Sequence, residues 1–434
     1  MKAWLRQTLS RLNASYWFLP ALLTLAAILL SVLTHWIDRS FGHEWLSGIT
    51  WLHDARPDGA RALLSTISGS MISVAGTVFA ITIAAVVYAS GNYGPRLLTN
   101  FMTDKGNQLT LGVFIATFVY CLLVLRTVRQ PDEAGMLDMA AGGGFVPQVS
   151  LLVSFALALL SVAVLVYFLH HVPDSIRINR VVATIGTRAL RAIESRFPDP
   201  DCGEEPVALE DGGTPVRAKR VGYVEVIDFA TLEGICKAQG IGVRLAVRPG
   251  DFVHPDVPLL HVSGSCGDQV PGQLRGAFAI GWSRTADQDL EYLLDELVEI
   301  ALRALSPGIN DPFTAITCLH WLSAATASLA TRDLRRDADG DPSGDNGVQA
   351  LPDDFAHFMQ RGFGAVRASA ASNHLASLNF LQALESVAAG PPSSARIALL
   401  QNEARRLLAQ AETELAGPAL EELRERVAAF APSD

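Results

Sequence analysis

Four long apolar runs, none with a charged side chain, constrain this chain more than any other feature. They cover residues 16–37, 62–89, 109–125 and 149–169. A helix needs about 20 apolar residues to cross the hydrocarbon core of a bilayer. Three runs reach that length, and the run at 109–125 reaches it if its flanks join the helix. The sequence therefore predicts a multi-pass α-helical membrane protein with four transmembrane helices.

The first run is expected to stay as an anchor rather than to be removed as a signal peptide. The basic residues Lys2, Arg6 and Arg11 precede it, as they would in a signal peptide. Its apolar part exceeds the roughly 7–15 residues of a signal peptide's apolar region, however, and no A-x-A cleavage site follows.

Charges beside the runs predict the orientation of the chain. The segment before the first run carries three cations and no acid, and residues 170–197 after the fourth run carry five arginines. Four crossings put both segments on one side, which the positive-inside rule makes the cytoplasm. The opposite loops at 38–61 and 126–148 also carry arginines, so the bias is moderate. We expect both termini to be cytoplasmic.

The second run differs from the others in its small and polar side chains. Hydroxyl residues recur in it at helical spacing and form one stripe, namely Thr66, Ser70, Ser73 and Thr77. The stripe has two readings: tight packing against another helix, since small residues let backbones approach, or a conduit whose weak oxygen ligands suit an inorganic ion. Both hold if the protein is a homo-oligomer. No ionisable carboxylate or amine lies inside the runs, which disfavours a carboxylate-relay transporter.

Overall charge and cysteine spacing disfavour two other classes of protein. The formal net charge is −10, whereas a nucleic-acid binder needs a basic face to neutralise phosphates. The cysteines form no C-x-x-C pair and are expected to be reduced thiols without metal-ligand spacing. They are Cys121, Cys202, Cys236, Cys266 and Cys318.

The rest of the chain is expected to form a cytoplasmic α+β tail with a small β-module and helices. The predicted divisions are a four-helix transmembrane domain at 1–172, a connecting helix at 173–197, a β-rich module at 217–282, a helix–loop–helix at 283–332 and a C-terminal helical region at 353–431. The acidic stretch at 333–352 is expected to be a mobile linker. Two or three helices are expected in the last region.

Residues 221–264 alternate short apolar runs with turn signals, which predicts strands around one short helix at 229–240. The order is similar to that of a barrel-sandwich, biotinyl- or lipoyl-like module. The nearest lysines, Lys219 and Lys237, lack the E-x-M-K-M context of such carriers, so we expect a structural module without a cofactor. His254 and His261 are taken as ordinary histidines rather than as a metal pair.

An acidic, amphipathic helix is predicted over 283–305. Thr285 and Gln288 have the spacing of a capping box at its start. Its six carboxylates fit a solvated face better than acid–base chemistry or a Mg²⁺ site.

The stretch "RALSPGINDPFTA" at 303–315 predicts a helix–loop–helix corner. Asn310 or Asp311 can cap the second helix, and Pro312 suits its first position because a proline there loses no hydrogen bond. The candidate corner residues are Arg303, Ser306, Gly308, Asn310 and Asp311. They form either a corner alone or a corner that also contacts a ligand or subunit through its free amides. No nucleophile or catalytic partner accompanies them, so neither an enzyme nor a metal site is predicted.

Several motifs together resemble those of a known family. They are "TISGSMISVAGTVFAIT", "NYGPRLLTNF", "LGVFIATFVYCLLVLRTVR", "HHVPDSI", "GYVEVID", "RPGDFV" and "ALSPGINDPFTA". Together they resemble the bacterial predicted membrane proteins of domain of unknown function 2254 over nearly the whole chain, apart from the linker at 333–352. The resemblance implies four crossings and a cytoplasmic tail, and it implies no chemistry.

These observations favour a homo-oligomeric channel or transport-like protein of the bacterial inner membrane, with a cytoplasmic region for assembly or gating. Its expected partners are the lipid bilayer, further copies of itself and an inorganic ion, but no nucleic acid. The alternative is a membrane-anchored sensor or scaffold that binds a partner or small ligand through its cytoplasmic tail.

Overall fold

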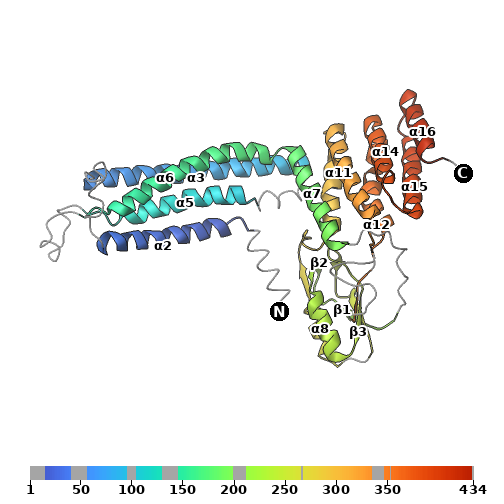
Figure 1. Ribbon diagram of the computed structural model, residues 1–434, viewed down its shortest axis with the longest axis horizontal. Helices are drawn as coiled ribbons and strands as arrows, with labels where there is room; N and C mark the ends of the chain where they lie inside the picture. Colours follow the sequence, from blue (N-terminus) through green and yellow to red (C-terminus); the bar gives the residue numbers. More distant parts are fainter. Residues whose placement is uncertain are drawn as a thin grey trace. The chain divides into compact units, whose positions relative to one another are not determined.

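The computed structural model describes eight stretches of the chain, and the description below is confined to them. They are residues 15–40, 56–94, 104–129, 145–198, 212–264, 267–334, 347–351 and 353–432. The chain divides into two compact units, one within residues 11–177 and one that contains residues 178–434. Each unit is described by itself (Figure 1). The stretch after Pro95, part of the quoted "NYGPRLLTNF", lies outside the described residues up to residue 103.

The first unit consists of long apolar helices. Each of the four predicted runs forms one: α2 (Phe18–Ser40), α3 (Pro57–Tyr93), α5 (Lys105–Leu125) and α6 (Gln148–Ser175). The short third run is lengthened at its start, because the Asp104 carboxylate accepts hydrogen bonds from two amides of the first turn of α5. The four helices run along a common direction (Figure 1).

Inside this unit, α2, α5 and α6 pack closely together, and one face of α3 contributes side chains to their shared apolar core. Leu64 and Met71 of α3 join Phe114 and Phe168 in the apolar core. The outward faces are also apolar, and several of their large side chains are more than half exposed, namely Leu29, Val32, Val87, Val166 and Leu169. Such a surface suits hydrocarbon rather than water.

Five described helices are long and apolar enough to cross a membrane, one more than predicted. The fifth is α11 (Pro312–Ala330), which lies in the second unit. Of its most apolar window 61% is buried within the chain, against 22–44% for α2, α3, α5 and α6. The chain thus combines several candidate membrane helices with a mixed α/β C-terminal region, and the number of four crossings stays a prediction.

The β-module of the second unit contains two small sheets. Their strands are β1 (Thr214–Arg217), β2 (Gly222–Ile227), β3 (Gly242–Leu245), β4 (Phe252–Val253), β5 (Pro258–Ser263), β6 (Phe278–Gly281) and β7 (Val348–Gln349). One sheet has the order β1-β5-β3-β7 and the other β4-β2-β6. All pairs are antiparallel except β3 with β7. The helices α8 (Phe229–Gln239) and α9 (Val270–Arg275) complete the module.

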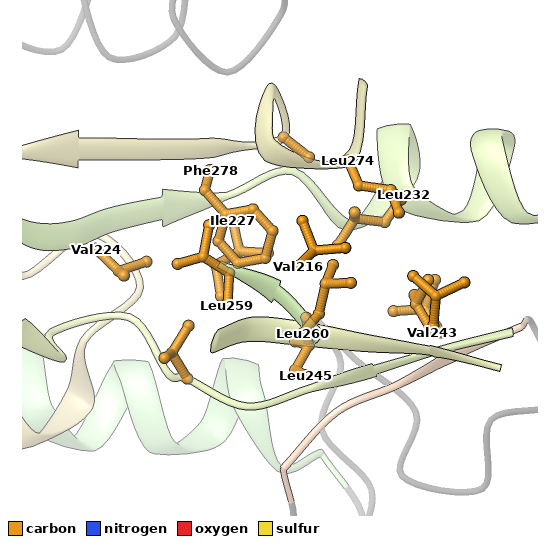
Figure 2. Packing of buried hydrophobic residues seen from close by; sticks show 14 of the residues in the cluster. Val216, Val224, Ile227, Leu232, Val243, Leu245, Leu259, Leu260, Leu274 and Phe278 are labelled. Carbon is orange, nitrogen blue, oxygen red and sulfur yellow. The ribbon is translucent and has the colours of Figure 1, made fainter. Parts of the chain in front are cut away.

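Apolar side chains from both sheets and both helices fill the centre of this module (Figure 2). Ile227 of β2 lies beside Phe278 of β6, its partner in the register. Leu259 and Leu260 of β5 are both buried, as is Leu232 of α8. The central strands are predicted correctly, whereas β7 lies at the end of the stretch expected to be a mobile linker, of which residues 335–346 lie outside the described part.

Helices form the rest of the second unit. They are α7 (Ile178–Arg196), α10 (Leu290–Ala304), α11, α12 (Phe355–Met359), a π-helix (Gln360–Gly364), α13 (Ala365–Ala371), α14 (His374–Ala388), α15 (Ser394–Ala411) and α16 (Pro418–Phe430). The expectation of two or three helices after residue 353 is therefore wrong. Helix α11 packs between α7 and α14, and α15 lies beside α14 and α16 (Figure 1).

Candidate functional site

The hydroxyl stripe lies on the exposed side of α3. Thr66, Ser70, Ser73 and Thr77 are all exposed, and each hydroxyl donates to a backbone carbonyl three or four residues earlier in the same helix. These bonds satisfy the hydroxyls without a partner helix. No described helix of the chain covers the stripe.

The side of α3 opposite the stripe packs into the bundle. At about 3.6 residues per turn, Leu64, Ile67 and Val78 point away from the hydroxyls, and they are buried. Gly69 and Gly76 border the stripe, and an added Cβ at either would have no atom within 4 Å. The stripe and its two glycines therefore form a strip of small residues on a face that also exposes large apolar side chains such as Leu63, Ile72 and Phe79.

A second polar feature ties α2, α5 and α6 together at one end of the bundle. The Asp38 carboxylate accepts hydrogen bonds from the amides of Val149 (2.8 Å) and Ser150 (3.0 Å). The Tyr120 hydroxyl lies 2.9 Å from that of Thr34 and donates to the Ser150 carbonyl. This network was not predicted from the sequence. The signal for it is Asp38, the first charged residue after the first apolar run.

The opposite end of the bundle carries an Asp–His–Tyr chain. Nε2 of His171 lies 3.0 Å from both carboxylate oxygens of Asp104, and Nδ1 lies 3.2 Å from the Tyr167 hydroxyl. An added Cβ at Gly106 would lie 2.6 Å from Nε2 of His171, so a larger residue there would displace the imidazole from its present position. This chain joins the start of α5 to the end of α6. The sequence did not predict this chain of hydrogen bonds.

The corner at 303–315 is formed as predicted. Asp311 caps α11 by accepting from the Thr314 amide (3.1 Å) and hydroxyl (2.6 Å), and Pro312 is the first residue of α11. Asn310 is the one non-glycine residue with positive φ, 49°, among those that the structure describes. The Asp311 carboxylate thus occupies the N-terminus of α11, and nearby Ser306 donates to the Arg303 carbonyl. Gly308 is exposed, and nothing packs against it.

Two large apolar side chains are exposed at this corner. Ile309 is 42% exposed and Phe313 is 71% exposed. They lie on either side of the capping residue Asp311, so the corner combines a rigid backbone with a small apolar surface. A corner that serves only to turn the chain does not need these two side chains.

The acidic helix forms an ion-pair cluster rather than a solvated face. The cluster consists of Arg284, Asp289, Glu291, Asp295, His357 and Arg361. Arg284 binds Asp289 with two parallel bonds of 2.7 and 2.9 Å, and Arg361 binds Asp295 with two of 2.6 Å. Arg361 lies in the π-helix, whose wider turn interrupts the α-helical path.

Two expectations for this helix are wrong. Asp289 and Glu296 are buried, and Asp295 is paired with two arginines, so these carboxylates are not solvated. The helix begins at Leu290 with Asp289 as its cap, not with a capping box, and Gln288 instead bonds both backbone groups of Ile227. Arg284 lies close to these acids in sequence, but Arg361 pairs with Asp295 from 66 residues away, beyond the reach of local pattern.

The cluster shifts the pKa values of its partly exposed members. Burial raises the pKa of Glu291, but the hydrogen bond from His357 and the charges of His357 and Arg361 outweigh it and lower this pKa overall. The hydrogen bond to Glu291 raises the pKa of His357 despite its partial burial. Burial also raises the pKa of Asp353, against the opposite effect of Arg196 and Arg248. These pairings suit a structural junction of helices and β-module.

No group of three or more His, Cys, Asp or Glu side chains in the described stretches converges on a possible metal site. Among the cysteines, Cys121, Cys236 and Cys318 are buried free thiols. The candidate sites in the described stretches are thus five separate features: the exposed stripe of α3, the two polar ends of the bundle, the corner and the ion-pair cluster.

Comparisons with known proteins agree with the apolar helices. The family of predicted membrane proteins designated DUF2254 matches residues 13–386. An uncharacterised protein of Mycobacterium bovis is 31% identical over 370 residues, which are 83% of this chain and 70% of that relative. Uncharacterised proteins of two Mycobacterium tuberculosis strains match to the same extent. No solved structure gives a significant match. The chain belongs to the DUF2254 family of predicted membrane proteins.

Proposed function

We propose that the protein is a homo-oligomeric channel or transport-like protein of the bacterial inner membrane, in which α3 lines a conduit for an inorganic ion. The observation that carries the proposal is the stripe of Thr66, Ser70, Ser73 and Thr77, which no other described helix covers. The cytoplasmic region assembles or gates the conduit, and both termini are cytoplasmic.

The small residues on the exposed side of α3 support this proposal. The stripe is bordered by Gly69 and Gly76, and small residues let helices of neighbouring copies approach closely in lipid. Hydroxyl oxygens are weak ligands, from which an ion can leave as readily as it binds. A helix face made only for lipid contact gains nothing from four hydroxyls, since its apolar neighbours already suit hydrocarbon.

In this proposal α2, α3, α5 and α6 cross the membrane, and α11 is a core helix of the cytoplasmic region. The Arg396 side chain, which is largely buried, donates to the carbonyls of Leu329 and Ala330 at the end of α11. An arginine that satisfies the last carbonyls of a helix suits packing within a protein. Trp321 of α11 also packs against Gly186 of α7.

Ion flux into liposomes that contain the purified protein tests the conduit. Ser73→Leu and Thr77→Leu place bulky apolar groups on the stripe and are expected to lower flux at least tenfold. Val162→Leu enlarges a side chain on α6 that is 55% exposed, and it serves as the matched control with unchanged flux. Absence of flux for a panel of cations and anions with correctly inserted wild type contradicts the proposal. Equal flux in the wild type and both stripe variants would mean that α3 does not line the conduit.

The exposed Ile309 and Phe313 favour a second candidate, a membrane-anchored scaffold or sensor that binds a partner at the corner. To test the scaffold, Phe313 is replaced by a photoreactive phenylalanine and the protein is cross-linked in cells. A discrete cross-linked protein that disappears with Ile309→Ser supports the scaffold. Cross-links only to lipid, or none, contradict it.

A further inference from the structure

The second unit carries a surface patch in which exposed apolar side chains adjoin exposed cations. We call it the basic–aromatic patch, and it consists of Lys219, Arg220, Val221, Phe252 and Trp282. Trp282 is 83% exposed, Val221 65% and Phe252 55%. Trp282 is the most exposed of the large apolar side chains in the described stretches, and such exposure marks a contact surface more often than a free one.

The sheet β4-β2-β6 holds the patch together. Tyr223 of β2 pairs with Phe252 of β4 on one side and with Gly281 of β6 on the other, and the rings of Tyr223 and Phe252 meet at 5.2 Å. A Cβ added at Gly222 would collide with the carbonyl of Gly281, so the start of β2 lies against the residue that precedes Trp282. Residues distant in sequence thus meet at one end of a rigid sheet.

The cations of the patch, Lys219 and Arg220, are exposed and have no ion-pair partner among the described residues. Arg217 lies at their side and donates to the backbone carbonyl of Asp256. Glu225 and Asp228, the described acids nearest to them in sequence, are buried. Asp251 accepts from the amide of Arg248, and the exposed Asp256 lies beside His254. The segment 217–220 therefore remains a local positive site on a chain of net charge −10.

We propose that the basic–aromatic patch docks on the anionic cytoplasmic surface of the membrane, with Trp282 and Phe252 at the headgroup level and Lys219 and Arg220 on lipid phosphates. Trp at this level combines an apolar body with a polar N–H group. Anionic lipids attract each nearby Lys or Arg by about 1 kcal/mol.

The position of the module in the chain makes the membrane the occupant. Only α7, whose 19 residues span about 28 Å at about 1.5 Å per residue, and the segment up to β1 separate it from α6. A covalent link to a helix that crosses the bilayer raises the effective concentration of the module at that surface, so weak lipid contacts suffice. A soluble partner has no such advantage. The inference rests on the proposed cytoplasmic placement of the second unit, but not on the conduit, because it concerns only lipid contact by the β-module.

Fluorescence quenching tests the inference on the full chain in nanodiscs. The discs contain brominated phosphatidylcholine alone or with phosphatidylglycerol, and the contribution of Trp282 is the difference between the wild type and Trp282→Phe. We expect bromine to quench this contribution in the discs with phosphatidylglycerol. Lys219→Gln with Arg220→Gln is expected to lower the ratio of docked to free module about fivefold for each cation removed. Added salt is expected to act in the same direction.

The matched control is Arg405→Gln with Arg406→Gln, which removes two exposed arginines of α15 and is expected to leave the quenching unchanged. Quenching that is equal with and without phosphatidylglycerol, or unaffected by loss of Lys219 and Arg220, overturns the inference. Burial of Trp282 that rises with protein concentration in detergent without lipid also overturns it, because a second copy of the chain then covers the patch. None of these readouts depends on ion flux, so the conduit is tested by a separate measurement.

Discussion

The Asp38 carboxylate accepts hydrogen bonds from both the amide (3.0 Å) and the hydroxyl (2.7 Å) of Ser150, 112 residues further along the chain. Asp38 lies at the end of α2, and Ser150 lies in the first turn of α6. A carboxylate at a helix N-terminus satisfies free amides and interacts favourably with the helix dipole. This one contact therefore joins two predicted membrane helices at one end of the bundle.

Asp38→Ala is expected to destabilise the bundle by about 2–3 kcal/mol, because it leaves the buried amides of Val149 and Ser150 without acceptors. Ser150→Ala removes only the hydroxyl and is expected to cost about 1 kcal/mol. Thermal unfolding in detergent measures both. Equal stability of wild type and Asp38→Ala would mean that water replaces the carboxylate without loss.

Gly186→Ala is expected to destabilise the second unit by about 1–3 kcal/mol, because the added methyl would collide with the Trp321 ring. Gly234→Ala is the matched control, since Gly234 lies within α8 and an added Cβ there has no atom within 4 Å. This second change is expected to stabilise by about 0.5–1 kcal/mol, as alanine favours a helix over glycine. Denaturant unfolding followed by tryptophan fluorescence compares the two. A neutral Gly186→Ala would show that α7 and α11 can separate freely.

The stability contributed by the His357–Glu291 pair is expected to depend on pH in both directions. The raised pKa of His357 means that its contribution is complete below its ordinary pKa of 6.5 and is lost as the pH rises through the raised value. The lowered pKa of Glu291 means that its contribution is present above its ordinary pKa of 4.5 and is lost as the pH falls through the lowered value. The pair therefore stabilises most between pH 4.5 and 6.5.

His357→Gln is accordingly expected to lower Tm most near the middle of that window and to have little effect in alkaline solution. The loss is expected to stay below about 1 kcal/mol, because His357 is partly exposed and solvent screens the pair. His320→Gln changes an exposed histidine of α11 and serves as the control. A Tm difference between wild type and His357→Gln that is constant with pH would contradict the coupling.

Substitutions at the corner are expected to show how much stability comes from the helix cap and how much from the backbone turn before it. Asp311→Ala is expected to cost about 1–2 kcal/mol through the lost cap of α11. Asn310→Gly is expected to be neutral or stabilising because glycine adopts positive φ freely, whereas Asn310→Val is expected to destabilise by at least about 1 kcal/mol. Chemical denaturation of the three variants measures these differences. Equal stability of the glycine and valine variants would show that the turn relaxes.

Local sequence was enough for the features that depend on neighbouring residues. The length and apolarity of each run predict α2, α3, α5 and α6, because an unbroken apolar helix satisfies its own backbone. The corner was predicted with Pro312 at the first position and with Asn310 or Asp311 as the cap, because a cap acts within three residues of itself, and the structure has Asp311 in that role. The central strands β2, β3 and β5 followed from alternation.

Short elements escaped prediction because they are held by distant partners. The two-residue strand β7 has no alternation of its own and exists through its parallel pairing with β3, about 100 residues earlier. The short strand β1 is likewise held by its pairing with β5. Such strands gain their stability from the sheet they join rather than from their own residues.

The sequence by itself determined the apolar helices, the capped corner before α11 and the hydroxyl stripe of α3, since each follows from residues a few positions apart. Only the tertiary structure decided that the stripe stays exposed, that Asp38 meets Ser150, and that arginines bury the carboxylates of the acidic helix. The spacing of polar and apolar residues predicts the faces of a helix. Which face is covered depends on packing between segments far apart in the chain. Those contacts are chosen by the shape and charge of the assembled surfaces, which no local pattern records.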